Sequence, residues 1–308
     1  MTAATLADAP GPAPEPPAGL RERVRNDPGL LVAPAAALLV LTQLVLRGWA
    51  AAGGYFLLDD FVFVYRAVEL PFDGRIFDDY NGHFMPGSFV LVELLTALAP
   101  LSWPAVVGLG LIQQLAIDVV LLRLLVALFG RRPAVLVPLA VYLASSITLP
   151  AFLWWAAALN QLPMQLAVLL ALRAPLRYLH SGRTAAAVRA TAAVGAGLAF
   201  SEKTVLALPL LAAVSLLWFG EGSVAARLRA TARTHRTGWL LLGGLGVAYT
   251  VFYLLHVPSP ILAVPSAADI AILAGQALVR SVLPGLLGGP WAWEDFPPTL
   301  AITDPPVV

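Results

Sequence analysis

Residues 57–89 read LLDDFVFVYRAVELPFDGRIFDDYNGHFMPGSF, and this polar stretch between long apolar runs decides how the chain is organised. It holds six of the 18 acidic residues in the 308-residue chain: Asp59, Asp60, Glu69, Asp73, Asp78 and Asp79. The apolar runs on both sides are long enough to cross a membrane, so the stretch is predicted to be a loop that emerges from a bilayer. Ionisable side chains gathered beside a membrane indicate a candidate functional site.

The composition excludes several classes of protein. Hydrophobic residues make up 59% of the chain and charged residues 12%, and the mean hydropathy is +0.81. A soluble domain carries roughly twice that charged fraction, so the composition predicts an integral membrane protein with several spans. The net charge of +1, without a basic stripe, argues against a nucleic-acid partner. With no cysteine, disulfides, thiol nucleophiles and thiolate metal sites are excluded.

Seven apolar segments are predicted to cross the membrane: 30–52, 104–128, 134–147, 153–172, 186–200, 204–219 and 238–255. A secretory signal is the alternative for the first segment, but its apolar run and the tail before it are both long for a signal. Residues 1–29, rich in Ala and Pro, are predicted to form a disordered tail. The predicted fold is an all-α, polytopic transmembrane helix bundle over 30–287, with an external loop over 53–103 that carries interfacial helices.

Basic residues predict the topology. They fall in the N-terminal tail and in the loops after the second, fourth and sixth predicted spans. Loops of this kind stay in the cytoplasm, so the chain is predicted to be a multi-pass plasma-membrane protein with a cytoplasmic N-terminus and residues 57–89 outside. Two further apolar segments, 84–101 and 267–287, would break this alternation if they crossed, so each is predicted to lie at the outer interface. Residues 288–308 are predicted to be external and to end before a further span.

Two polar motifs lie in the predicted external loop. Asp59 and Asp60 follow the first span, where a carboxylate can accept a proton from a hydroxyl or help to hold a divalent cation. The alternative is that the pair only ends a helix. In the second motif, Asn81 precedes Gly82, which permits an unusual backbone angle, and His83, which can donate to a phosphate. The alternative there is an exposed interfacial turn.

A third motif, Glu202-Lys203, lies between the fifth and sixth predicted spans. Ionisable residues at such a position are paired or functional, and Lys203 could bind an anionic phosphate as a point charge. The alternative is a Glu–Lys pair at a tight turn. Trp155, with Trp154, falls near the outer end of the fourth span, where it could anchor the helix at the interface or stack on a sugar.

Polar residues also fall inside the predicted spans at helical spacing: Gln113, Gln114, Asp118, Asn160, Gln161 and Gln165. Side chains of this kind normally hydrogen-bond neighbouring helices, which is the role expected for all of them. Asp118 is the most costly of the six to bury, so it is expected to have a partner such as Arg123.

Together, four segments resemble those of a known superfamily: Leu58-Asp59-Asp60-Phe61, Asn81 to Pro86, Trp154 to Pro163, and Phe200 to Lys203. The arrangement resembles the GT-C superfamily of polytopic glycosyltransferases, which contains the protein mannosyltransferases and the aminoarabinose lipid A transferases, and more narrowly an actinobacterial branch of it. The resemblance extends over roughly residues 30–290. The family's usual acidic pair is Asp-Glu, and here it is Asp-Asp. Members often carry further C-terminal spans.

The resemblance implies a membrane glycosyltransferase whose donor is a sugar carried on a polyprenyl phosphate. It implies that Asp59 or Asp60 acts as general base or metal ligand, which leaves a divalent cation open as a cofactor. The substrate-binding residues that we assign with it are Asn81, His83, Trp155, Glu202 and Lys203. The sugar, the lipid carrier and the acceptor stay open.

Two other functions remain. A transporter or flippase for a lipid or small solute would have a water-accessible path lined by Gln113, Asp118, Asn160 and Gln165, with Asp59 dispensable. A non-catalytic membrane scaffold would need neither set of residues. Acidic residues crowded at one external mouth, with few charges in the spans, favour the enzyme.

Overall fold

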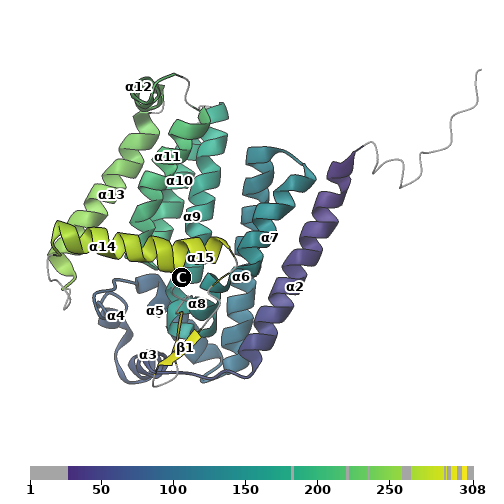
Figure 1. The fold of residues 1–308 in the computed structure, drawn as a ribbon. Coiled ribbons are helices and arrows are strands. Elements are labelled where there is room, and N and C mark those ends of the chain that lie inside the picture. Colours follow the sequence, from purple (N-terminus) through teal and green to yellow (C-terminus); the bar gives the residue numbers. More distant parts are fainter. Residues whose placement is uncertain are drawn as a thin grey trace, which may run out of the picture.

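The computed structural model describes residues 27–181, 184–219, 222–234, 236–258, 265–287, 289, 293–296 and 300–303. In this part of the chain nearly every element is a helix, and the long helices stand side by side in a bundle (Figure 1). The predicted helical bundle of membrane type is confirmed at this level. Most of the predicted disordered tail, residues 1–26, lies outside the described residues.

The bundle consists of α2 (Val32–Ala52), α6 (Trp103–Phe129), α7 (Leu136–Ala144), α9 (Trp155–Ser181), α10 (Thr184–Leu198), α11 (Ala207–Phe219) and α13 (Arg236–His256). Short 3-10 turns precede or join them: η1 (Pro28–Leu31), η2 (Pro133–Val135), η3 (Ser146–Thr148) and η4 (Glu202–Leu206). Helix α9 packs against α6 on one side and α10 and α11 on the other, so it lies at the centre of the bundle.

Four of the seven predicted spans are single helices long and apolar enough to cross a membrane: Pro28–Ala52, Trp103–Phe129, Trp155–Arg173 and Arg236–His256. The third is broken, because Pro133–Ala144 and Ser146–Leu153 meet at 43°. The break falls at Ser145, whose extended backbone ends α7. The fifth and sixth correspond to α10 and α11, which are shorter, with 15 and 13 residues.

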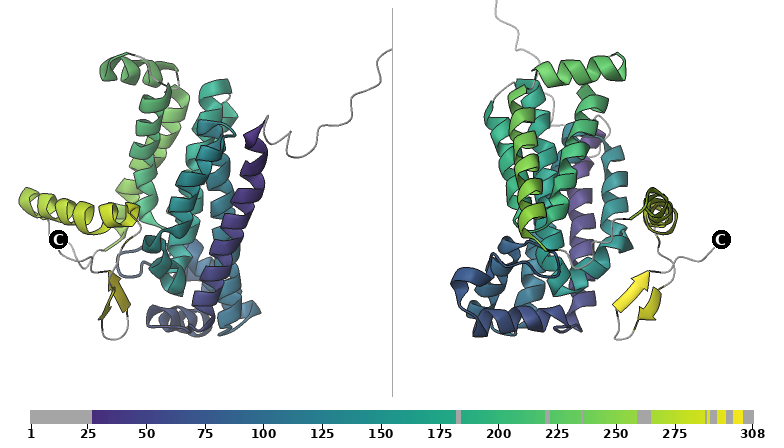
Figure 2. Two further views of the ribbon diagram at one scale, coloured as in Figure 1. Left: turned by 45° about the vertical axis from the view of Figure 1, so that its right-hand side comes forward. Right: turned by 90° about the vertical axis from the view of Figure 1, so that its left-hand side faces the viewer.

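A further segment, predicted to be an interfacial helix, is also long and apolar enough to span: Ala267–Leu286. It consists of α14 (Ala267–Ala277), η5 (Leu278–Val282) and α15 (Leu283–Leu286), and Ser266 and Asp269 cap its start reciprocally. The segment lies across the direction of the bundle helices in both views (Figures 1 and 2). This crosswise direction is the one that an interfacial helix takes.

One end of the bundle is covered by α3 (Asp59–Glu69), α4 (Phe72–Arg75) and α5 (Pro86–Leu98) (Figure 1). Helix α5 is the predicted interfacial helix of 84–101. Its 13 residues extend about 20 Å, too short for a hydrocarbon core of about 30 Å. Aromatic rings fix this cover to the bundle: Phe56 packs edge to face on Trp103 and Trp155 with ring centroids 5.5 and 5.4 Å apart.

The opposite end of the bundle carries the basic loops. The turn after α6, with Arg131 and Arg132, and helix α12 (Val224–Thr234) lie there, away from α3–α5 (Figures 1 and 2). The alternation read from the sequence therefore corresponds to two distinct ends of one bundle, and which end faces the cytoplasm stays a prediction. Near the C-terminus, β1 (Trp293–Phe296) and β2 (Leu300–Thr303) pair antiparallel, an element that hydropathy did not predict.

Candidate functional site

A pocket of about 230 Å³ lies at the end of the bundle that α3–α5 cover. Four segments far apart in the sequence contribute polar residues to its lining: Asp59, Tyr80, Asn81, His83, Trp154, Asn160, Gln161, Ser201 and Lys203. All four segments that carry the family resemblance therefore meet at one place. The N-terminal end of α9 and the C-terminal end of α10 bring residues 154–163 and 200–203 to the external loop.

The two aspartates have different roles in the structure. Asp60 is fully buried, and its carboxylate accepts hydrogen bonds from the N–H groups of Leu57 at 2.9 Å and Ala156 at 2.7 Å. The second bond satisfies a donor in the first turn of α9, as a helix cap does. Burial raises the pKa of Asp60 to about 6, although the two backbone bonds oppose this. Asp60 thus joins α3 to α9.

Asp59 lines the pocket. The hydroxyl of Tyr80 donates to its Oδ1 at 2.7 Å. Burial, together with this bond to Asp59, raises the pKa of Tyr80 to about 12, so Tyr80 stays protonated and keeps donating at neutral pH. Leu58, directly before Asp59, has a φ of +46°, a strained angle for a branched residue. The structure therefore selects Asp59 as the pocket carboxylate, a choice that the sequence left open.

Other acidic residues of the loop are engaged in ion pairs outside the pocket. Arg75 binds Glu93 with two bonds of 2.6 Å, and Arg66 lies 3.3 Å from Asp78. The Arg66 guanidinium also lies over the ring of Phe89, 4.9 Å from its centroid. These pairs hold the loop in shape, and they engage Asp78 of the acidic residues in 57–89.

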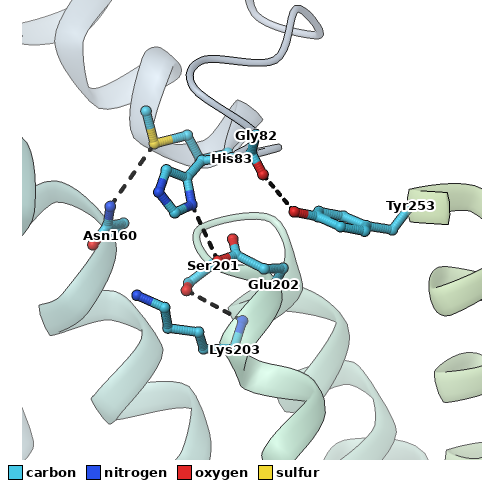
Figure 3. A network of polar contacts seen from close by, with 8 residues as sticks. Gly82, His83, Asn160, Ser201, Glu202, Lys203 and Tyr253 are labelled. Atoms are coloured by element: carbon cyan, nitrogen blue, oxygen red, sulfur yellow. Dashed lines mark hydrogen bonds and ion pairs between the residues drawn. The ribbon is translucent and has the colours of Figure 1, made fainter. Parts of the chain in front are cut away.

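The second motif forms a tight turn. Asn81 and Gly82 have φ angles of +51° and +79°, and Tyr80 and His83 exchange both backbone N–H···O=C bonds, at 3.0 and 2.9 Å. Positive φ at both central residues is typical of a type I′ turn, for which Asn-Gly is the strongest sequence signal. The turn was predicted from the sequence only through the conformational freedom of Gly82. On the other side of the turn, the hydroxyl of Tyr253 in α13 donates to the Gly82 carbonyl (Figure 3).

His83 contacts the third motif. Its Nδ1 lies 3.1 Å from Oε1 of Glu202 (Figure 3). Burial alone would raise the pKa of Glu202, but the bond to His83, the backbone N–H of Glu202 and the charges of His83 and Lys203 outweigh it and lower this pKa. Glu202 is therefore an ionised partner that orients the imidazole of His83.

Lys203 extends from η4 toward α9, into the space beside Asn160 (Figure 3). The Glu202–Lys203 pair considered from the sequence does not form, because Glu202 contacts His83 instead. Within the described ranges no carboxylate lies at ion-pair distance from the Lys203 ammonium. An ammonium at such a position can bind an anion in the pocket.

A close contact at Gly87 brings the second and third motifs together. The N–H of Gly87 donates to the Ala199 carbonyl at 2.7 Å. A Cβ at this position would lie 2.8 Å from the ring of Phe200. Only glycine permits this approach, so Gly87 sets the distance between the His83 turn and η4.

The predicted substrate contact of Trp155 needs correction. Trp155 is 4% exposed and packs in the core, while Trp154 lines the pocket with Asn160 and Gln161. Trp154 has an extended backbone and α9 begins at Trp155, so the two side chains point in different directions. Nε1 of Trp154 and Oδ1 of Asn160 are buried and have no hydrogen-bond partner in the described part of the chain. Such unpaired atoms beside a pocket are available to a bound molecule.

The carboxylates of the acidic pair do not act together. Both oxygens of Asp60 accept from backbone N–H groups, whereas Asp59 contacts Tyr80. In the ranges that the structure describes, no three His, Cys, Asp or Glu side chains are grouped closely enough to hold a metal ion.

A second polar cluster lies inside the bundle. Asp118, fully buried on α6, accepts from the amide of Gln114 at 2.8 Å. With its amide turned, Gln43 on α2 donates to the other Asp118 oxygen at 2.9 Å and accepts from Arg47 Nε at 3.3 Å. Asp118 was expected to pair with Arg123, but its hydrogen-bond partners are Gln114 and Gln43. Gln43 in turn accepts a hydrogen bond from the positively charged Arg47.

This interior cluster extends to α7 and α9. The hydroxyl of Tyr142 donates to Gln165 at 3.0 Å, and Arg47 donates to Thr148 and lies over the ring of Phe152. Asn160, by contrast, lines the outer pocket. Of the residues expected to line one path in a transporter, Asp118 and Gln165 therefore lie in the interior cluster and Asn160 lies in the outer pocket.

Comparison with family models, curated proteins and solved structures finds no match for this chain. The resemblance to GT-C glycosyltransferases therefore stays a prediction, and the geometry of the pocket has to carry the functional argument.

Proposed function

We propose that the chain is a membrane glycosyltransferase of GT-C type that moves a sugar from a polyprenyl-phosphate donor to an acceptor hydroxyl at the outer face of the plasma membrane. One observation carries the proposal. A single pocket combines a carboxylate, Asp59, with an ammonium, Lys203, that has no carboxylate at ion-pair distance in the described ranges. A transfer of this kind needs a base at one point and an anion-binding group at another.

In the proposed reaction, Asp59 accepts the proton of the acceptor hydroxyl, whose oxygen attacks the anomeric carbon. The bond from that carbon to the phosphate oxygen breaks, and its electron pair stays on the departing polyprenyl phosphate. Lys203 and His83 stabilise the negative charge on this phosphate. Attack opposite the leaving group would invert the anomeric centre.

Several neighbouring residues hold the groups that the proposed reaction would use. Tyr80 holds the carboxylate of Asp59, and Glu202 orients His83. The unpartnered polar atoms of Trp154 and Asn160 suit the hydroxyl groups of a sugar, since convergent polar groups in a pocket fix a ligand's orientation. The lipid tail of the donor would stay in the bilayer beside the pocket.

Membranes containing the chain, supplied with radiolabelled polyprenyl-phosphate sugars, provide the test. Asp59→Asn should reduce transfer about 10²–10⁴-fold, the contribution typical of a general base. Asp78→Asn is the matched control, because Asp78 is in the same loop but pairs with Arg66, and it should transfer at close to the wild-type rate. Lys203→Gln should raise the donor KM.

Three outcomes would overturn the proposal: wild-type transfer by a normally expressed Asp59→Asn variant, equal losses in Asp59→Asn and Asp78→Asn, or no transfer by the wild-type chain from any donor.

A further inference from the structure

A groove runs along α7. It begins at the basic end of the bundle and is separate from the outer pocket. Its first part holds about 550 Å³ and is lined by Arg132 and by apolar residues such as Leu128 and Pro138. A second part of about 600 Å³ shares Pro138 and continues past Val141 to the crosswise segment at Leu286. The two parts therefore adjoin at Pro138 on α7.

The groove has a simple chemical pattern, with one cation at its mouth and apolar walls behind it. In the described part of the chain no carboxylate lies at ion-pair distance from Arg132, and the sequence has no Asp or Glu between Asp118 and Glu202. The backbone oxygen and Cγ of the neighbouring Arg131 lie close to Gly29, and Arg131 does not line the groove. Among the described residues that line the groove, Arg132 is the one that carries a charge.

The length of the groove also indicates its occupant. From Val135 to Ser145 the backbone extends about 15 Å at the rise of a helix, which is half of a hydrocarbon core about 30 Å thick. The path thus matches the depth of one leaflet. An arginine binds phosphate oxygens through paired N–H donors, and apolar walls suit an acyl chain.

We propose that this groove binds one anionic phospholipid of the leaflet at the basic end, with its phosphate on Arg132 and one acyl chain along α7. The site is independent of the proposed glycosyl transfer, because it shares no lining residue with the outer pocket. Such a lipid would stabilise the broken α7–α8 segment (α8, Leu149–Leu153) against α6.

The test uses the purified full chain in detergent, titrated with phosphatidylglycerol or with zwitterionic phosphatidylcholine while its Tm is measured. We expect phosphatidylglycerol to raise the Tm of the wild type more than phosphatidylcholine does. Arg132→Gln should weaken the apparent phosphatidylglycerol Kd about tenfold, the effect of one charge-assisted hydrogen bond. The matched control, Arg131→Gln, should keep the wild-type response.

A second variant tests the groove without changing its charge. Val141 is 46% exposed on the groove side of α7, so Val141→Trp should fill the path and also weaken the phosphatidylglycerol response. Equal responses to both lipids, an unchanged response in Arg132→Gln, or an equal loss in Arg131→Gln would overturn the proposal. So would a dimer that forms through Val141 and excludes the lipid, since a second copy would then occupy the groove.

Discussion

The outer pocket and the interior cluster both gather polar side chains from distant segments, but they differ in how many partners those side chains have. In the interior, both carboxylate oxygens of Asp118 are bonded, although Oε1 of Gln114 has no partner in the described ranges. In the pocket, the ammonium of Lys203 has no carboxylate partner in the described ranges, and Trp154 and Asn160 keep unpaired polar atoms. An exposed charge without an ion-pair partner, and not polar richness or an unpaired neutral atom, therefore distinguishes the pocket from the interior cluster.

The physical reason is the cost of desolvation. A charge inside a membrane-spanning bundle is costly unless it is paired and hydrogen-bonded, so an interior cluster persists only when its members bond one another. At the pocket, the exposed ammonium of Lys203 stays hydrated until a ligand arrives, so it is tolerated without an ion-pair partner. This contrast makes the interior the region where single changes destabilise most, and the pocket the region where they change activity.

The largest expected effect is in the interior. Replacing only one charged member, by Arg47→Met or Asp118→Leu, leaves the other charge buried, and should lower the free energy of unfolding by about 3–5 kcal/mol. The double variant should recover much of that loss. Unfolding of the purified variants in detergent measures both. Single losses that simply add in the double variant would show that the two charges do not act through Gln43.

The next effect concerns Asp60, the buried neighbour of the pocket carboxylate Asp59. Its pKa is raised to about 6, so the folded chain binds this proton more tightly than the unfolded chain does. The resulting stability is fully present below about pH 4 and is lost as the pH rises to about 6, about 3 kcal/mol at most. The difference in Tm between wild type and Asp60→Asn should follow this window. A difference independent of pH from 4 to 7 would contradict it.

In the pocket, Tyr80→Phe removes the hydroxyl that holds Asp59 and keeps the ring. Loss of a hydrogen bond to a charged group costs about 1.5–3 kcal/mol, so kcat should fall about ten- to hundredfold with donor KM nearly unchanged, because Tyr80 is a positioning residue. Steady-state kinetics separate the two constants. A rise in KM at constant kcat would instead indicate a role in binding.

The smallest expected effect is at α13. Tyr253→Phe removes the bond to the Gly82 carbonyl, a neutral bond worth about 0.5–1.5 kcal/mol, so the donor KM should rise about two- to tenfold as the His83 turn loosens. Tyr249→Phe is the control, since the Tyr249 hydroxyl is buried and has no partner in the described ranges. If both variants raised KM equally, packing of α13 and not the bond would be responsible.

Much of the fold follows from sequence by local physics. Runs of apolar residues predict helices that match the long members of the bundle, because hydropathy reports directly on what a bilayer accepts. The alternation of basic loops predicted which loops share an end, and the structure has them there. The continuity of the helices was less well predicted. The third span is broken at Ser145, because an average of hydropathy does not report the backbone conformation of a single residue.

The candidate site was predictable as a set of motifs but not as a geometry. Residue type alone indicated Asp59, His83 and Lys203, and Asn-Gly could have predicted the turn before His83. No sequence pattern distinguishes Asp59 from Asp60, or Trp154 from Trp155. Those choices depend on where α3 and α9 begin and on contacts such as the bond from Ala156 to Asp60, which joins residues 96 positions apart. The sequence by itself determined a helical membrane chain with one polar, carboxylate-rich end, because composition acts locally, whereas only long-range packing decided which side chains face the pocket.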